Sequence, residues 1–223
     1  MYLAHPSGLK AHTVATQAHS KPRLRLPWCV QAGANLFRDG DRCAGLFEIL
    51  SGTVRLSRLT RDGRRSVIGF GFPGDILGFG PEGHHIADCD AISDARVIRH
   101  RPEGLHGIGA DPDQQRALLN GALRQIAGMQ DHCMMLGRLP ARDRVAAFLS
   151  QLGDRLGVPL GRYLAFDLPM SRADIADYLG LTNETVSRSL TELRNARLIA
   201  IENLHHFVLL SPQHLTAQAE DEA

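Results

Sequence analysis

The sequence lacks the marks of a secreted, membrane-spanning or zinc-binding protein. Its apolar runs fall well short of the roughly 18 residues that span a bilayer, and the opening stretch MYLAHPSGLKAHT lacks the charged-then-apolar order of a secretory signal. No two cysteines form a C-x-x-C pair, so a structural zinc site is not expected. These absences predict a cytoplasmic protein with no membrane segment and no metal. We expect four reduced, buried or half-buried thiols: Cys29, Cys43, Cys89 and Cys133.

The chain also lacks the excess of basic charge that is typical of many nucleic-acid binders. Its 223 residues carry a net charge of +1, with 22% charged and 43% hydrophobic residues, which are ordinary values for a globular protein. From Arg142 to the C-terminus there are eight arginines and eleven acidic residues. Any nucleic-acid surface must therefore come from the local placement of arginines.

Common catalytic motifs are absent from the sequence. We find no nucleophile elbow, P-loop, H-E-x-x-H or dinucleotide-binding fingerprint. We therefore expect that the protein is not an enzyme.

The texture of the chain predicts four segments in an α+β fold. Residues 1–27 form a proline-containing lead-in. Residues 28–110 contain short apolar runs broken by glycines, which is the pattern of an antiparallel β-roll, and the Asp-Gly pair within 61–64 indicates a hairpin turn. Residues 111–137 form a long helix, and residues 138–223 mix short helices with short strands.

A regular apolar seam runs along the expected long helix. Its members alternate three and four residues apart, as at the a and d positions of a coiled coil: Leu119, Ala122, Ile126, Met129, Cys133 and Leu136. Because closed two-fold dimers dominate soluble oligomers, we interpret the seam as a homodimer contact and the segment as a dimerisation helix. In this interpretation Cys133 is a buried seam residue. The alternative is that the seam packs against the β-roll of the same chain.

Two short helices joined by a glycine are predicted after residue 170. Ser171 can cap the first helix, with Asp174 completing a capping box, and Gly180 can end it in the left-handed conformation. Thr182 can cap the second helix. The runs LIAIEN and FVLLS follow as two short strands of a wing. This order is typical of a winged helix-turn-helix, whose second helix enters the major groove of double-stranded DNA.

The second helix has a polar face that requires an explanation. Helical spacing brings four polar residues together, opposite an apolar face that packing explains: Glu184, Ser187, Arg188 and Thr191. Arg188 offers a fork for guanine, Glu184 can accept from cytosine, and Ser187 can touch a thymine methyl or a phosphate. The alternative is an exposed salt bridge between Glu184 and Arg188, which contributes only about 0.3–0.5 kcal/mol.

The order of β-roll, long helix and winged helix-turn-helix over residues 30–215 resembles the CRP/FNR superfamily of bacterial transcription regulators. The run ETVSR at 184–188 matches the E-x-x-S-R recognition motif of the FNR branch, and LPMSRADIADYLGLTNETVSRSLTEL is especially similar to the FixK group. The resemblance implies a cyclic-nucleotide-binding-like β-roll, a homodimer on a TTGAT-N4-ATCAA palindrome, contacts with RNA polymerase, and activation of genes for low-oxygen metabolism. It places Arg188 on the guanine, Glu184 on the opposite cytosine and Ser187 beside a thymine. It also implies contacts to the DNA backbone from Ser171, Arg172, Thr182 and Thr185.

The β-roll departs from the members of this superfamily that bind a cyclic nucleotide. Those members hold the ribose with a Glu and the phosphate with an Arg-Ser pair, because each group needs a charged or bidentate partner. Here Phe79 stands near the position of the Glu, and His85-Ile86 stands near the position of the pair. We therefore expect no cyclic-nucleotide binding.

An iron–sulfur cluster and a histidine-bound metal are not expected either. A cluster needs four thiolates, but residues 1–28 contain no cysteine and Cys133 lies in the seam. The adjacent pairs His84-His85 and His205-His206 are poor chelates, because neighbours on a strand point to opposite faces. The alternative function is a sensor-regulator of the same fold that is gated by haem, NO or another small molecule.

Overall fold

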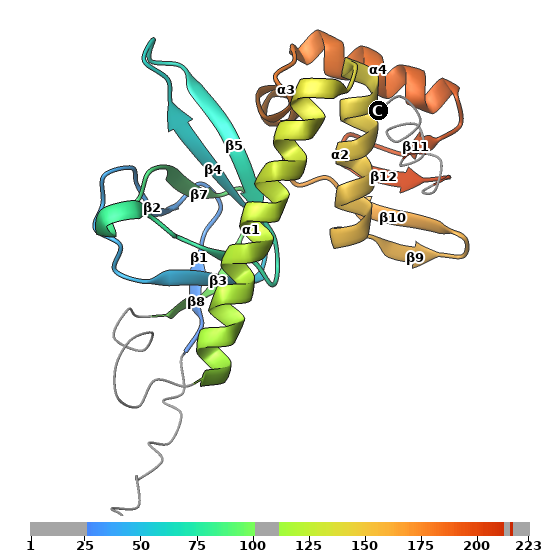
Figure 1. Ribbon diagram of the computed structural model, residues 1–223. Helices are drawn as coiled ribbons and strands as arrows, with labels where there is room; N and C mark the ends of the chain where they lie inside the picture. The colour runs from blue at the N-terminus through green and yellow to red at the C-terminus, as the bar shows by residue number, and fades with distance from the viewer. Residues whose placement is uncertain (1–25, 101–111, 212–214, 216–223) are drawn as a thin grey trace, which may run out of the picture.

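The computed structural model describes residues 26–100, 112–211 and 215. A β-roll and a helical domain lie on either side of one long helix, α1 (Figure 1). The fold is therefore α+β, as the sequence predicts, with β-roll, long helix and winged helix-turn-helix in the expected order. Nearly all of the predicted lead-in at 1–27 lies outside the described residues.

The β-roll consists of two four-stranded antiparallel sheets, in the orders β1-β8-β3-β6 and β2-β7-β4-β5. Their strands are β1 (Trp28–Val30), β2 (Asn35–Phe37), β3 (Leu46–Ser51), β4 (Val54–Leu59), β5 (Arg65–Gly71), β6 (Ile76–Leu77), β7 (Asp88–Ala91) and β8 (Ala95–His100), with a short 3-10 turn η1 at Pro81–Gly83. Inward-facing residues of both sheets form one core: Val30, Phe47, Ile49, Val54, Cys89 and Val97. The predicted Asp-Gly turn joins β4 to β5, and Gly63 takes the positive φ of 78° that the turn requires.

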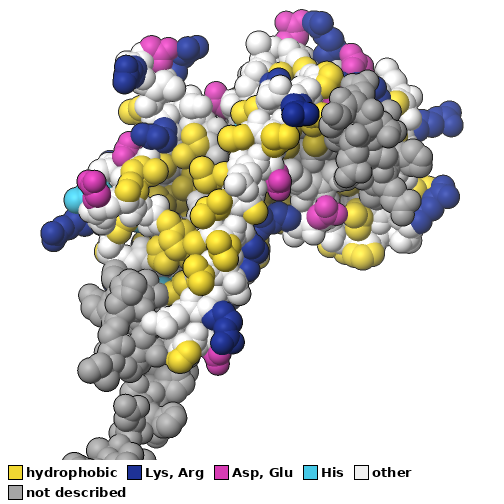
Figure 2. Space-filling model, viewed as in Figure 1, with side chains coloured by type: hydrophobic (Ala, Val, Ile, Leu, Met, Phe, Trp, Pro, Cys, Tyr) yellow, Lys and Arg dark blue, Asp and Glu magenta, His cyan; other side chains and the backbone are white. Residues whose placement is uncertain are grey.

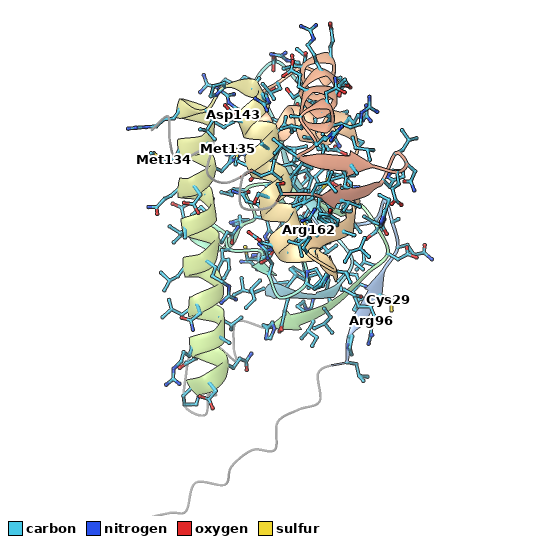
Figure 3. The ribbon with its side chains drawn as sticks, turned by 90° about the vertical axis from the view of Figure 1, so that its right-hand side faces the viewer. Cys29, Arg96, Met134, Met135, Asp143 and Arg162 are labelled. Carbon is cyan, nitrogen blue, oxygen red and sulfur yellow. The ribbon has the colours of Figure 1, made fainter. Side chains whose placement is uncertain are left out.

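Helix α1 (Pro112–Arg138) presents two different faces. On its inner face Leu118, Gly121 and Met135 are buried against the rest of the chain. Its outer face is apolar but exposed: Leu119, Leu123, Ile126, Met129 and Met134 each keep more than half of their surface in solvent. Figure 2 shows hydrophobic side chains gathered along this helix, and in Figure 3 Met134 lies on the outer side while Met135 faces α2.

The helical domain follows a sharp elbow after α1. Helix α2 (Ala141–Leu156) leads into the hairpin of β9 (Val158–Leu160) and β10 (Tyr163–Asp167), then α3 (Arg172–Leu179), α4 (Asn183–Asn195), β11 (Ile199–Ile201) and β12 (His206–Leu209). The strands form one antiparallel sheet in the order β11-β12-β10-β9. Residues from every helix of the domain share one core with this sheet: Phe148, Leu149, Phe166, Ile175, Leu190 and Phe207. The hairpin β9–β10, which adds two strands to the wing sheet, is not predicted from the sequence.

Candidate nucleic-acid interface

Local signals in the sequence fix the ends of α3 and α4. The Ser171 hydroxyl accepts from the Asp174 amide at 3.1 Å, and the Asp174 carboxylate accepts from the Ser171 amide, so the predicted capping box is formed. Gly180 ends α3 with φ 63° and ψ 38°, the left-handed conformation that glycine adopts without strain. The Thr182 hydroxyl caps α4 by accepting from the Thr185 amide at 3.1 Å. These three hydrogen bonds and the conformation of Gly180 confirm the predicted helix boundaries.

Packing between the two helices turns the polar face of α4 outward. The predicted apolar residues of both helices are buried to 5% exposure or less: Ile175, Ala176, Leu179, Val186, Leu190 and Leu193. Burying three large aliphatic side chains of α4 contributes several kcal/mol to its attachment. The rotation of α4 about its own axis is therefore set by its core face, and its polar face is presented to solvent.

The polar face of α4 carries a closed ion pair in this structure. Arg188 donates from Nη2 to Glu184 Oε1 at 2.5 Å, and both side chains are more than two-thirds exposed. The salt bridge considered from the sequence is thus present. Because an exposed i,i+4 pair contributes only about 0.3–0.5 kcal/mol, opening it for another partner costs little. The pair holds a guanidinium and a carboxylate side by side on the exposed face of the helix.

The residues predicted at the DNA backbone gather where α3 and α4 begin. Arg172 on α3 donates from Nη1 to the Ser187 hydroxyl on α4 at 3.3 Å. The Thr182 and Thr185 hydroxyls lie 2.8 Å apart in the first turn of α4. Ser171 is committed to its cap, where its hydroxyl also donates to Asp174 Oδ2 at 2.7 Å. The structure thus brings these side chains to the edge of one surface, around the exposed face of α4.

The wing is a tight antiparallel hairpin of β11 and β12. Asn203 Oδ1 accepts from the amides of His205 and His206 at 2.9 and 2.8 Å and shapes its turn. His205 donates from Nδ1 to the Leu168 carbonyl at 3.2 Å, which ties the turn to the start of the helix pair. The tip residue Leu204 is 72% exposed. The two histidines engage different partners, since His206 pairs with Asp167 instead.

Three arginines that no sequence pattern singles out hold the helix pair in place. Arg144 on α2 donates from Nε to the Leu139 carbonyl at 2.8 Å and from Nη1 to the Leu179 carbonyl at 3.1 Å. It therefore joins the α1–α2 elbow to the end of α3. Arg55 and Arg65 of the β-roll both bind Asp174 Oδ1, at 2.6 and 2.9 Å. No local pattern reveals such contacts, because the partners lie far apart in the chain.

The Asp174 carboxyl is buried yet ionised. Burial alone would raise its pKa, but hydrogen bonds from Ser171 and Arg55 outweigh burial and hold the pKa below its usual value. Its side chain is 5% exposed. The carboxylate thus carries a full charge at neutral pH and binds both its own helix start and the β-roll.

In the β-roll, the positions compared with a cyclic-nucleotide site hold no exposed charge. The His85 ring is buried and stacks on Phe37, with centroids 3.9 Å apart, and its Nδ1 lies 3.5 Å from the Cys43 sulfur. Burial lowers the pKa of His85, so the ring is neutral at physiological pH. Ile86 is 45% exposed, and Phe79 is half-buried. Neither an arginine nor a carboxylate stands at these positions.

The cysteines differ in part from expectation. Cys89 is buried and Cys43 is half-buried, as predicted, and burial raises the pKa of both thiols. Cys29 is exposed, which corrects the prediction, because β1 is an edge strand and this residue points away from the core. Cys133 is exposed on α1. Within the described residues, no three His, Cys, Asp or Glu side chains cluster as a metal site.

Fold and site together define a class of protein. A capped helix-turn-helix with a wing, attached through a long helix to a sensory-type β-roll, is the architecture of a DNA-binding transcription regulator. Across the described helices, none combines the length and the apolar content needed to cross a membrane.

Comparison with known proteins identifies the family. Residues 143–218 match the Crp-like helix-turn-helix domain, and residues 28–108 match the cyclic nucleotide-binding domain. The chain is 36% identical over 212 residues to the nitrogen fixation regulation protein FixK of Rhizobium meliloti strain 1021, covering 95% of each chain. It is 31% identical over 197 residues to the fumarate nitrate reduction regulatory protein of Klebsiella oxytoca, covering 87% of this chain and 78% of that one.

A solved structure agrees with this assignment. The structure of FixK2 from Bradyrhizobium japonicum superposes with a TM-score of 0.78 and 31% identity, covering 87% of this chain and 96% of that one. The chain therefore belongs to the CRP/FNR family of transcription regulators and is FixK-like. The members of this family are regulators and not enzymes, as the sequence predicts.

Proposed function

We propose that this protein is a homodimeric activator that binds a TTGAT-N4-ATCAA-like palindrome and controls genes of low-oxygen metabolism. The observation that carries the proposal is the exposed Glu184–Arg188 pair, held at the start of a recognition helix whose opposite face is fully buried. The names of the FixK and fumarate nitrate reduction relatives support the physiological role. Activation requires contact with RNA polymerase, and transcription places the protein in the cytoplasm.

In this proposal each side chain on α4 has a distinct partner in the DNA. Arg188 bonds guanine O6 and N7, and Glu184 accepts from the amino group of the opposite cytosine. Ser187 lies beside a thymine, with Arg172 next to it reaching a phosphate. The remaining backbone contacts come from the capped helix starts, where amides and hydroxyls face the phosphates: Ser171, Thr182 and Thr185.

The dimer forms through the outer face of α1. Exposed apolar area of this extent on a helix marks an interaction site, and a 27-residue helix offers about seven turns of it. In each subunit the recognition helix lies at the C-terminal end of α1. Parallel pairing of the two α1 helices about a two-fold axis therefore presents both recognition helices to one DNA duplex. We assign the seam to the predicted residues: Leu119, Ala122, Ile126, Met129, Cys133 and Leu136.

We further propose that neither a cyclic nucleotide nor an iron–sulfur cluster is required. The neutral, stacked ring of His85 and the apolar Phe79 offer no charged partner to a phosphate or ribose. His85 and Phe79 therefore do not fit a cyclic nucleotide, the ligand for which this domain family is named. In the competing function, haem, NO or another small molecule gates the same DNA binding.

The proposal is tested by titrating purified protein, in air and without ligand, onto the palindrome at fixed salt. Arg188→Ala is expected to cost about 1–3 kcal/mol of binding on the palindrome and to abolish discrimination against duplexes with altered half-site guanines. Arg194→Ala, an exposed arginine later in α4, is the matched control and should keep that discrimination. If Arg188→Ala retains guanine discrimination, the base assignment is wrong. If wild-type protein binds no palindrome until a small molecule is added, the gated sensor is favoured.

A further inference from the structure

The β-roll grips the first helix of the DNA-binding domain through one carboxylate. Arg55 on β4 donates two hydrogen bonds to Asp90 on β7, from Nε to Oδ1 at 3.2 Å and from Nη2 to Oδ2 at 2.7 Å. Its remaining nitrogen, Nη1, reaches Asp174 Oδ1 on α3 at 2.6 Å, and Arg65 on β5 adds a second bond to the same oxygen. We call Arg55, Arg65 and Asp174 the α3 latch. Its arginines come from the β4–β5 hairpin, which lies beside α3 in Figure 1.

The latch divides the two oxygens of Asp174 between two tasks. Oδ2 accepts from the Ser171 amide and hydroxyl within the capping box, while Oδ1 accepts from the two arginines. Because the carboxylate is charged, moving α3 away from the β-roll would break two charge-assisted hydrogen bonds at once. The contact therefore favours one position of α3 on the β-roll over a range of positions.

An aromatic contact beside the latch fixes the angle of α3. Phe70 on β5 meets the Tyr178 ring edge-on, with centroids 5.3 Å apart, and also lies 6.0 Å from Phe148 on α2. On its other side Tyr178 stacks on His132 of α1, at 4.0 Å. The β-roll, α1 and α2 thus converge on α3.

Whatever holds α3 also holds the recognition helix. The two helices share a closed core, and Arg172 bonds directly to Ser187 across them. In a dimer, the position of α3 on each β-roll therefore sets the distance and angle between the two copies of α4. One base pair more or less between half-sites moves them by about 3.4 Å and turns them by about 35°, since a turn of duplex holds about 10 base pairs in 34–36 Å.

We propose that Arg55 and Arg65 are positioning residues that select the spacing between half-sites. They touch no base; they act through Asp174 by fixing α3, so that only one spacer length meets both recognition helices. This inference rests on the proposed function, because it requires a dimer on a palindrome. It assigns sequence preference within a half-site to α4 and preference for spacer length to the β-roll.

The test measures affinity on duplexes with identical half-sites and spacers of about two to six base pairs. The affinity of wild-type protein for one spacer length should exceed that for the neighbouring lengths by at least about tenfold. A DNA-binding domain that is held rigidly on the β-roll cannot rotate by the required angle of about 35°. The double variant Arg55→Ala/Arg65→Ala should reduce that preference below about threefold and keep discrimination at the half-site guanines. Arg58→Ala/Arg61→Ala, which removes two exposed arginines of the same hairpin, is the matched control and should behave as wild type.

Further variants separate positioning from a loss of folding. Arg65→Lys keeps the charge of the arginine that makes a single bond to Asp174, and it should retain most of the spacer preference. If the double alanine variant unfolds, Arg65→Gln alone, at a 43% exposed side chain, should still reduce the preference measurably. A uniform loss of affinity at every spacer, with the preference unchanged, would overturn the inference. If wild-type protein binds no palindrome at any spacer, the proposed function fails instead, and that result is distinct.

Discussion

The close approach of α1 to the β-roll makes a sharp prediction at Gly121. A β-carbon at this position would lie 2.9 Å from Cδ1 of Ile76 and 3.1 Å from its Cβ, and Ile76 is itself buried. Gly128 occupies the same face of α1 one heptad later, and a β-carbon there would meet nothing within 4 Å. The variants Gly121→Ala and Gly128→Ala therefore add the same methyl group to the same helix. At Gly121 the methyl group meets Ile76, and at Gly128 it meets nothing within 4 Å.

The magnitude follows from two opposing effects. Alanine favours the helix over glycine by about 1 kcal/mol at either site. At Gly121 the added methyl must push a packed isoleucine, and overpacking a core costs about 1–3 kcal/mol. Gly128→Ala should therefore raise the free energy of unfolding by about 1 kcal/mol. The free energy of unfolding of Gly121→Ala should be lower than that of Gly128→Ala by about 1–3 kcal/mol.

Urea unfolding at one protein concentration measures the difference. Concentration must be fixed because the stability of a dimer depends on it. With a slope of about 2 kcal/mol/M, the two midpoints should differ by about 0.5–1.5 M. If both variants gain stability equally, α1 does not pack on β6 as described, and the placement of the dimerisation helix against the β-roll is wrong.

Two further predictions concern the dimer and the α3 contact. Ile126→Glu, on the outer face of α1, should give a monomer in analytical ultracentrifugation and lose binding to the palindrome. Ile126→Leu, which keeps the apolar surface, is the control and should remain dimeric. A dimeric Ile126→Glu would contradict the seam. Burial raises the pKa of Tyr178 to about 12, so its contribution to stability is complete below its ordinary pKa of about 10 and is lost as pH rises through 12. Ultraviolet titration of tyrosinate should show this late ionisation disappear in Tyr178→Phe, and an early ionisation would show that the ring is not buried.

The helix pair could be predicted from the sequence because its determinants are local. The Ser171 cap, the Gly180 terminus and the Thr182 cap each act within about four residues, so their types and spacing decide the outcome. The hairpin β9–β10 could not be predicted in the same way. Its first strand has three residues, all exposed, and its second strand pairs with β12 far along the chain.

The same distinction applies to the candidate site. The face of Glu184, Ser187 and Arg188 follows from helical periodicity, and the structure shows that face exposed. The hydrogen bond from Arg55 to Asp174 joins residues 119 positions apart. Neither the pattern of β4 nor that of α3 predicts it. The outer seam of α1 was visible as a heptad pattern, but its inner face was not, because Gly121 gives no hydrophobic signal.

The unbroken run of α1 has a consequence for how this protein can change. The helix is a single shaft of 27 residues with the β-roll bound near one end and the elbow at the other. Each residue added or removed along it would turn the distal part by about 100° and shift it by about 1.5 Å. Such a change would move the DNA-binding domain away from the α3 latch. It would also turn part of the outer face of α1 away from the partner helix of the dimer. Substitutions can accumulate along α1, but its length is fixed. Even a step of about seven residues, which returns both faces to register, would move the DNA-binding domain by about 10 Å and separate Asp174 from Arg55 and Arg65.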